Sequence, residues 1–371
     1  MSNMKKLGFG LMRLPLNSEY WEDVDYEKSK ELIDEYMSKG FNYFDTAAHY
    51  HMGNSQLVVK AFLANRYSRE QFILANKLPI FDMNDKTDPE ECRIRFNRQL
   101  EDCGVEYFDY YMVPSLGRRN YYLDEKLGLF SFVSEMKAAG RVKRMGFSYH
   151  DDSILLEQIL KEHPNVDFVQ LQINYLDWND ECVQARKNYE VCRRYGVDII
   201  VMGPLRGGVL AGIRSSEMLH LHPDWSPASW AMRFAASLPN VIMVLSGMNH
   251  MEQLIDNTEI LGDFDKLTEQ ETEILMNAAD ALSGITGKCT GCNYCLSKCP
   301  EHIQIPRFIN YYEKNAYFDY INTPDTYLNL ISEGRPSEMC LNCGKCVEIC
   351  PQGIDIPDIL RKSDEMLDFM G

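Results

Sequence analysis

Eight of the twelve cysteines lie in two short runs near the end of the 371-residue chain. Both runs have the spacing C-x2-C-x2-C-x3-C-P, in which three thiolates wrap one face of a cubane and the fourth cysteine points away. Because the fourth cysteine of such a run ligates the other cluster when two runs are present, we expect two [4Fe–4S] clusters with crossed ligands. The first set is Cys289, Cys292, Cys295 and Cys350, and the second is Cys340, Cys343, Cys346 and Cys299.

The alternative for these cysteines is a pair of structural zinc sites. Structural zinc is usually held by two separated ligand pairs, whereas each run packs four cysteines into eleven residues and ends in proline. The insert between the runs, residues 303–338, carries an apolar pattern that favours a mainly α-helical ferredoxin-like module. Four cysteines lie far from the runs, and we interpret them as buried structural thiols: Cys92, Cys103, Cys182 and Cys192.

A second group of residues has the types needed to reduce a carbonyl. Hydride addition requires a proton donor at the nascent alkoxide. A tyrosine can donate that proton if a nearby ammonium stabilises its phenolate, and a carboxylate can hold the lysine in place. Asp45, Tyr50 and Lys77 have these residue types. Each alone could be a cap, a packing residue or a solvated charge, but together they favour the catalytic interpretation.

The elements that must position these residues follow a regular alternation. Short apolar runs and amphipathic stretches alternate at roughly thirty-residue intervals, which predicts a (β/α)8 TIM barrel. The expected strands are residues 6–11, 41–45, 72–76, 108–113, 144–148, 168–173, 198–202 and 241–245. The expected helices include residues 25–39, 89–103, 127–139, 153–163 and 183–195. A doubly wound open sheet is the alternative, but no G-x-G-x-x-G follows the first strand.

The two parts meet after a further expected helix, residues 268–283. We therefore predict a barrel domain over residues 1–283 and a small, mainly α-helical ferredoxin-like domain over residues 284–371. Chemistry in a (β/α)8 barrel lies at the C-terminal ends of the strands. Asp45 ends the second expected strand, Lys77 directly follows the third, and Tyr50 lies in the loop after the second.

Further motifs stand at the same strand ends, and with them the chain resembles a known family. They are D-T-A-x-x-Y at residues 45–50, G-F-S at 146–148, P-L-R-G-G at 204–208 and S-G-M at 246–248. The chain resembles the aldo/keto reductases that carry a C-terminal ferredoxin-like extension, over nearly its whole length. The resemblance implies an oxidoreductase with a small-molecule carbonyl substrate and with Asp45, Tyr50 and Lys77 as catalytic residues.

The same resemblance implies a nicotinamide cofactor, NADPH or NADH, across the barrel mouth. Its implied contacts are Ser148 and Gln170 at the carboxamide, Met202 near the ring, Ser246, Gly247 and Met248 at the phosphates, and Gln253 and Asn257 towards the adenine. Pro204 and Leu205 are further implied cofactor-binding residues. Gln253 stands where the family usually has a basic residue for the 2′-phosphate, which leaves the choice between the two cofactors open.

One position departs from the family, whose fourth catalytic residue is a histidine ending strand four. This chain has Pro114 there, and proline offers neither a side-chain donor nor an N–H group. Either a neighbour such as His51, His150 or Ser115 takes over, or the substrate needs no such contact, or the reaction is not ordinary carbonyl reduction. A metal site at His49 and His51 lacks a nearby carboxylate or cysteine, so we interpret His51 as a substrate hydrogen-bonding group.

Three functions follow from these observations. In the first, which we favour, the barrel is a nicotinamide-dependent reductase of a small carbonyl compound, and its clusters either exchange electrons with a redox protein partner or are structural. In the second, the clusters deliver single electrons to a substrate in the barrel without nicotinamide. In the third, a catalytically weakened barrel is a docking module for an electron carrier. A hydride carries two electrons and a cluster one, and no flavin fingerprint is present to convert between them.

Charge and composition exclude several other partners. The formal net charge is −17, which argues against nucleic acid and against an anionic membrane surface, because both attract lysine and arginine. Neither a signal-peptide pattern nor a run of 18 apolar residues occurs in the sequence. Clustered cysteines without an export signal indicate metal ligation in a reducing compartment, so the expected location is the cytoplasm.

Overall fold

The computed structural model describes residues 5–18, 20–118, 120–180, 183–213, 215–262, 264–282, 289–309, 312 and 336–368. The chain forms two compact units, Met1–Met276 and Asn277–Gly371, and each is described by itself. The domain boundary expected near residue 284 lies outside the described residues.

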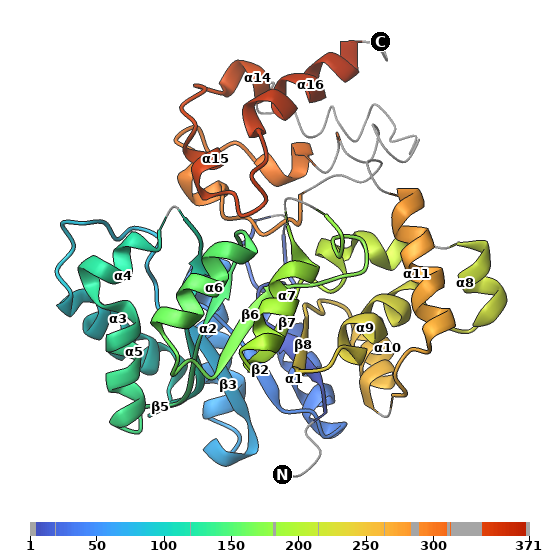
Figure 1. The fold of residues 1–371 in the computed structure, drawn as a ribbon. Helices are drawn as coiled ribbons and strands as arrows, with labels where there is room; N and C mark the ends of the chain where they lie inside the picture. Colours follow the sequence, from blue (N-terminus) through green and yellow to red (C-terminus); the bar gives the residue numbers. More distant parts are fainter. Residues whose placement is uncertain are drawn as a thin grey trace. The chain divides into compact units, whose positions relative to one another are not determined.

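The first unit is a closed barrel of eight parallel strands in sequential order (Figure 1). Its last strand pairs with its first, with Leu7 opposite Val244 and Phe9 opposite Ser246, so the sheet has no free edge. The strands are β1 (Leu7–Gly10), β2 (Tyr43–Asp45), β3 (Ile73–Lys77), β4 (Phe108–Leu116), β5 (Val142–Tyr149), β6 (Phe168–Gln172), β7 (Asp198–Met202) and β8 (Val241–Ser246). The predicted (β/α)8 barrel is confirmed.

Side chains on the inner face of the strands fill the barrel. Successive residues of a strand face opposite sides, so Tyr43 and Asp45 share the inner face of β2. Gly146 of β5 is required by close packing, because a Cβ at this position would collide with the carbonyl oxygen of Phe168 on β6. The buried residues of this interior are Tyr43, Ala75, Tyr110, Met112, Phe168, Ile200, Met243 and Leu245.

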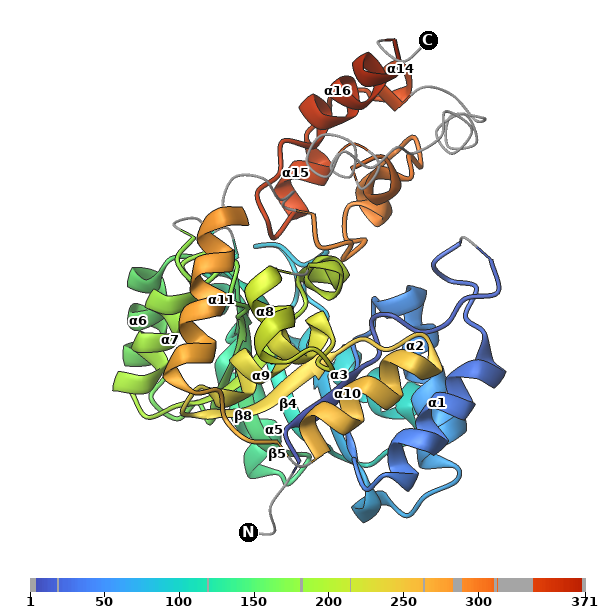
Figure 2. The ribbon, with the colours of Figure 1, turned by 90° about the vertical axis from the view of Figure 1, so that its right-hand side faces the viewer.

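Helices surround the strands of the barrel (Figures 1 and 2). They are α1 (Tyr26–Ser38), α2 (Asn54–Val59), α3 (Glu90–Cys103), α4 (Tyr122–Leu127), α5 (Leu129–Ala138), α6 (Ser153–Glu162), α7 (Ala185–Arg194), α8 (Ser216–Leu221), α9 (Pro227–Ser237) and α10 (Met251–Gly262), followed by α11 (Glu269–Leu282). Helix α6 illustrates how the local sequence forms these helices. Asp152 caps it by accepting hydrogen bonds from the N–H groups of Ile154 and Leu155, and an apolar stripe including Leu156 and Ile159 is buried.

The end of β4 differs from its prediction. The strand was expected to end at residue 113, but it continues through Pro114 to Leu116. The pairing with β5 shifts its register between Val113 and Leu116. Proline has no N–H for the ladder, and Ser115 after it adopts a left-handed φ of 52°. The strand therefore bulges where it reaches the barrel mouth.

The second unit contains short helices around a small apolar core. They are α14 (Pro336–Met339), α15 (Lys345–Ile349) and α16 (Ile356–Asp368). The core consists of Cys295, Ile303, Ile305, Phe308, Ile309, Cys346, Ile354, Ile356 and Leu360. Most of the insert that was predicted to be helical, residues 310–311 and 313–335, lies outside the described residues. Within the described part of the chain, no helix is long and apolar enough to span a bilayer.

Candidate active site and cluster site

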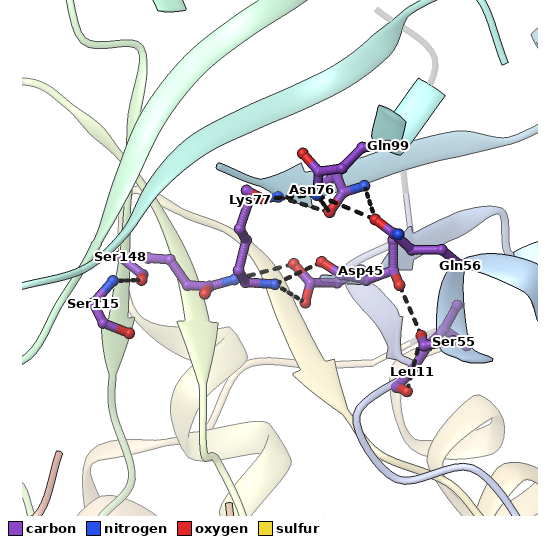
Figure 3. Close-up of polar contacts among 11 residues, drawn as sticks. Leu11, Asp45, Ser55, Gln56, Asn76, Lys77, Gln99, Ser115 and Ser148 are labelled. Atoms are coloured by element: carbon purple, nitrogen blue, oxygen red, sulfur yellow. Dashed lines mark hydrogen bonds and ion pairs between the residues drawn. The ribbon is translucent and has the colours of Figure 1, made fainter. Parts of the chain in front are cut away.

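The ends of β2 and β3 bring a lysine and an aspartate into contact. Asp45 pairs with Ala75, two residues before Lys77, so both strands end at the same rim of the barrel. Lys77 Nζ donates to Asp45 Oδ1 at 2.6 Å (Figure 3). It also donates to the carbonyl oxygen of Thr46 at 3.0 Å. Asp45 is 2% exposed and Lys77 4%. The ammonium is therefore held in place by a buried carboxylate.

Tyr50 lies beside this ion pair. It begins a tight turn, Tyr50–Gly53, that follows β2 and in which His51 and Met52 have left-handed φ angles of 52° and 54°. Its ring is buried, and Lys77 Nζ lies 4.9 Å from the ring centre. The structure thus brings together the three residues expected from the sequence. A nearby ammonium favours the ionised form of a phenol, so this arrangement suits a tyrosine that gives up a proton.

Two neighbouring histidines have different environments. His51 Nε2 accepts a hydrogen bond from the N–H of Leu14 at 3.1 Å, and its Nδ1 lies 2.6 Å from the carbonyl oxygen of Trp21. The ring is therefore the neutral Nδ1–H tautomer with both nitrogens engaged. His51 ties the N-terminal loops to the segment that carries Tyr50, and the expectation that it binds substrate is wrong.

His49 is the imidazole next to Tyr50. Its ring packs edge-on against the Tyr50 ring, at 4.7 Å between centres, and against Phe81 at 4.8 Å. Burial, with the charge of Lys77, lowers the pKa of His49 to about 3. The ring is thus neutral at physiological pH. Among the described residues, no third histidine, cysteine, aspartate or glutamate side chain joins His49 and His51 as a metal ligand.

The residues expected at the carboxamide lie beside the ion pair. Ser148 of β5 and Gln170 of β6 are partners in the sheet register, and both are buried. Gln170 Nε2 donates to Asp45 Oδ2 at 3.3 Å. Ser148 Oγ accepts a hydrogen bond from the N–H of Ser115 at 2.6 Å (Figure 3). Accepting that bond leaves the Ser148 hydroxyl hydrogen to serve another acceptor. A polar rim therefore runs from the bulge of β4 to Asp45.

Met202 ends β7, the loop after it carries Pro204 and Leu205, and a buried ion pair supports this loop. Arg206 Nε lies 3.1 Å from Asp177 Oδ1, with both side chains nearly inaccessible. Asp177 Oδ2 also accepts from Asn174 Nδ2 and Gln172 Nε2, each at 2.8 Å. The backbone of Arg206 has a φ of 46°, followed by two glycines with φ of 69° and 103°. This left-handed turn needs the glycines of the P-L-R-G-G motif.

The residues after β8, the strand that pairs with β7, form the adjoining part of the mouth. Asn257 Nδ2 of α10 donates to Ser246 Oγ at 3.0 Å, and Gln253 Oε1 accepts the N–H of Asn249 at 3.0 Å. Arg13 crosses Gly247 so closely that a Cβ there would lie 3.0 Å from Arg13 Cβ. Met248 is buried. Arg13 is a basic group at this rim that was not predicted from the sequence. Arg13 and Gly247 are far apart in the chain, so no local pattern indicates that they meet.

The second unit contains a cavity lined by cysteines. Cys299, Cys340, Cys343 and Cys346 all line it, together with apolar residues that include Ile305 and Leu360. These four cysteines form the second ligand set expected from the sequence, and Cys299 comes from the other run. Thiolates that surround a space suit a cubane, in which each sulfur binds a different iron.

The two most buried cluster cysteines, Cys295 and Cys346, each have neighbouring cysteines from both runs. Burial raises the pKa of Cys295, and the nearby thiols that add to this effect are Cys292, Cys289 and Cys350 of its predicted set and Cys346 of the other set. Burial raises the pKa of Cys346 to about 11, with Cys340 and Cys299 among its neighbours. The residues present therefore fit two clusters with crossed ligands. Cys92, Cys103 and Cys192 are buried elsewhere, as expected, and Cys182 lies outside the described residues.

Comparison with known proteins agrees with both parts of this description. The sequence profile of the aldo/keto reductase family matches residues 6–280. The chain belongs to the aldo/keto reductase family. A second profile, that of the 4Fe-4S dicluster domain, matches residues 288–354, which contain all eight cysteines of the two runs. This aldo/keto reductase is therefore an oxidoreductase with an iron–sulfur domain after its barrel.

Individual relatives share the barrel of this aldo/keto reductase at low identity. The NADH-specific methylglyoxal reductase of Escherichia coli is 21% identical over 328 residues, covering 75% of this chain and 96% of that protein. An aldo-keto reductase from Bacillus halodurans in its holo form superposes with a TM-score of 0.59 at 21% identity, covering 74% of this chain and 91% of that one. One from Klebsiella pneumoniae in complex with NADPH has a TM-score of 0.56 at 16% identity, covering 73% and 90%.

Proposed function

We propose that this aldo/keto reductase reduces a small carbonyl compound with a nicotinamide cofactor and exchanges electrons through two [4Fe–4S] clusters. The observation that carries the proposal is the Lys77 ammonium held between the Asp45 carboxylate and the Tyr50 ring. The methylglyoxal reductase among its relatives makes methylglyoxal and similar small dicarbonyls the first substrates to test. That relative is NADH-specific, whereas the Klebsiella structure holds NADPH.

The residues of the barrel have separate tasks in this reaction. Tyr50 donates the proton to the oxygen of the carbonyl being reduced, and the Lys77 ammonium lowers the cost of the phenolate that remains. Asp45 fixes the position of that ammonium. The nicotinamide, when bound, supplies the hydride. Ser148 and Gln170 have the donors and acceptors that orient a carboxamide beside the ion pair, while the residues at the end of β8 would hold the phosphates and those on α10 would face the adenine.

Each cluster is proposed to have three ligands from one run and one from the other. Cys343 is exposed, unlike the buried Cys295 and Cys346. The second cluster therefore has a ligand that a redox protein can approach. Such a partner would exchange single electrons with the clusters, because each cubane carries one electron.

Anaerobic calorimetric titration of the reconstituted protein with NADPH and, separately, NADH tests the proposal. Binding of either at micromolar or tighter affinity supports it, and the preferred cofactor is then used in a carbonyl screen that begins with methylglyoxal. A Gln253→Arg variant probes the cofactor preference, because it adds a cation on α10 at the position expected near the adenine, although it also removes the hydrogen bond that Gln253 accepts from the Asn249 N–H.

Absence of binding by both cofactors would support a different function, in which the clusters reduce a substrate in the barrel directly. The specific observation that favours this second function is Pro114 at the bulged end of β4, because proline itself has no side-chain donor. Reduction of a carbonyl by chemically reduced clusters, without nicotinamide, would then be the measurement.

A further inference from the structure

Three buried amide side chains lie behind the end of β3. Gln56 comes from α2, Asn76 from β3 and Gln99 from α3, and all three are at most 2% exposed. Asn76 Nδ2 and Gln99 Nε2 both donate to Gln56 Oε1 at 3.1 Å, and Gln99 Nε2 also lies 2.9 Å from Asn76 Oδ1 (Figure 3). The three amides therefore form one connected cluster. Its hydrogen bonds must be kept, because a buried amide without a partner destabilises the fold.

This cluster binds the backbone of Lys77 on both sides. The Lys77 N–H donates to Asn76 Oδ1 at 2.8 Å, and its carbonyl oxygen accepts from Gln99 Nε2 at 2.9 Å. The pairing with β4 at this level runs through the N–H of Leu78 and the carbonyl oxygen of Met112, at 3.0 Å. Side-chain amides thus hold the polar backbone groups of the lysine.

A tyrosine on β4 sets the direction of the Gln99 amide. Tyr111 OH donates to Gln99 Oε1 at 2.6 Å, and the tyrosine is fully buried. Because a hydroxyl hydrogen directed at the amide oxygen leaves the amide nitrogen on the other side, Gln99 Nε2 must face Lys77 and Asn76. The orientation is therefore dictated by the network.

We propose that Gln99 is a positioning residue that sets the Lys77 ammonium against Tyr50 through the lysine's own carbonyl group. The inference rests on the proposed function of Tyr50 as proton donor. The side chain of Lys77 is anchored at its far end by Asp45 and Thr46. Without the hydrogen bond from Gln99 to its carbonyl oxygen, Lys77 keeps Asp45 and Thr46 as partners, but the distance between its ammonium and the Tyr50 phenol is no longer fixed. A displacement of about 1 Å at such a site can cost about 100-fold in rate.

The test compares Gln99→Met, which keeps the volume but removes the amide, with Asn188→Leu as control. Asn188 is a buried amide on α7 that donates to the backbone of Asp151 and Val183, away from β3. Two quantities are measured in each: the pKa of Tyr50, by NMR of ¹³C-labelled tyrosine assigned with Tyr50→Phe, and the pH profile of kcat with methylglyoxal and the cofactor that binds.

Gln99→Met is expected to raise the Tyr50 pKa by about one unit and to lower kcat about 10- to 100-fold, with cofactor affinity within about twofold of the parent. Asn188→Leu is expected to lose stability without either change. If Gln99→Met does not fold, Tyr111→Phe removes only the hydroxyl that orients the amide, and a smaller shift in the same direction is expected.

The inference is overturned if the folded Gln99→Met variant has the Tyr50 pKa and the kcat of the parent. If only Tyr111→Phe folds, the same result in that variant overturns it. In both cases the proposed function stands. Parent protein that neither binds a nicotinamide nor turns over removes the proposed function. The NMR titration would still show whether Gln99 controls the distance between Lys77 and Tyr50.

Discussion

Replacing Tyr50 with phenylalanine removes one hydroxyl group and little else. The ring keeps its contacts with His49, at 4.7 Å between centres, and with Lys77 Nζ, at 4.9 Å. Lys77 keeps its hydrogen bonds to Asp45 and Thr46. The expected consequence is therefore confined to proton donation, which is worth about 10²- to 10⁴-fold in rate. This corresponds to about 2.7–5.4 kcal/mol in the activation barrier.

The assay is steady-state turnover of methylglyoxal with the cofactor identified by calorimetry, under anaerobic conditions. kcat is expected to fall by that factor, whereas the dissociation constant of the cofactor is expected to stay within about twofold, because the hydroxyl acts on the substrate. The free energy of unfolding is expected to change by about 1 kcal/mol or less.

Tyr43→Phe is the matched control in the same barrel. Tyr43 lies on β2 two residues before Asp45 and is 1% exposed, and its hydroxyl has no hydrogen-bond partner among the described residues. Removing a buried polar group without a partner is expected to be neutral or to stabilise the protein by about 1–3 kcal/mol. Turnover is expected to be that of the parent.

Two results would refute the reasoning. If Tyr50→Phe retains turnover within about threefold of the parent, Tyr50 is not the proton donor, because general acid catalysis contributes far more than this. If Tyr43→Phe loses as much activity as Tyr50→Phe, the loss comes from repacking of the barrel and says nothing about a proton.

Three further predictions concern other parts of the molecule. Asp177→Ala leaves the buried Arg206 without this carboxylate and is expected to destabilise the protein by about 3–5 kcal/mol, as measured by chemical denaturation. An effect below about 1 kcal/mol would mean that the ion pair is not maintained. Crossed ligation predicts that the double variant Cys292→Ala, Cys350→Ala retains about four of about eight irons after anaerobic reconstitution, because both residues serve one cluster; loss of all iron would indicate uncrossed ligands. The folded-state pKa of His49, about 3, lies below its ordinary value of 6.5, so its contribution to stability is complete above pH 6.5 and is lost as the pH falls towards 3. His49→Phe is therefore expected to flatten the fall of the unfolding midpoint between pH 7 and about 5 relative to the parent, and identical slopes would contradict the shift.

Much of the fold and part of the candidate site could be predicted from the sequence. The strands follow from apolar runs and the helices from amphipathic stretches, because side chains repeat every two residues in a strand and every 3.6 in a helix. Asp45 and Lys77 could be placed together because parallel strands end at one rim of a barrel. The end of β4 was misplaced, because the effect of Pro114 depends on the pairing with β5.

By itself, the sequence determined the features that depend on short spacing. Three cysteines within seven residues can wrap one cluster whatever surrounds them, and the D-T-A-x-x-Y motif places Tyr50 five residues after the end of a strand. Tertiary structure decided how distant residues are used. His51 has a substrate-binding residue type, but contacts with Leu14 and Trp21 occupy both of its nitrogens.

Gln99 is the clearest example of a role that only the tertiary structure decides. It is an ordinary polar residue of α3 in the sequence, and only the packing of α3 against α2, β3 and β4 places its amide on the backbone of Lys77. A hydrogen bond requires two groups to meet within about 3 Å. For residues far apart in the chain that meeting is set by the packing of whole elements, so no local pattern in the sequence reports it.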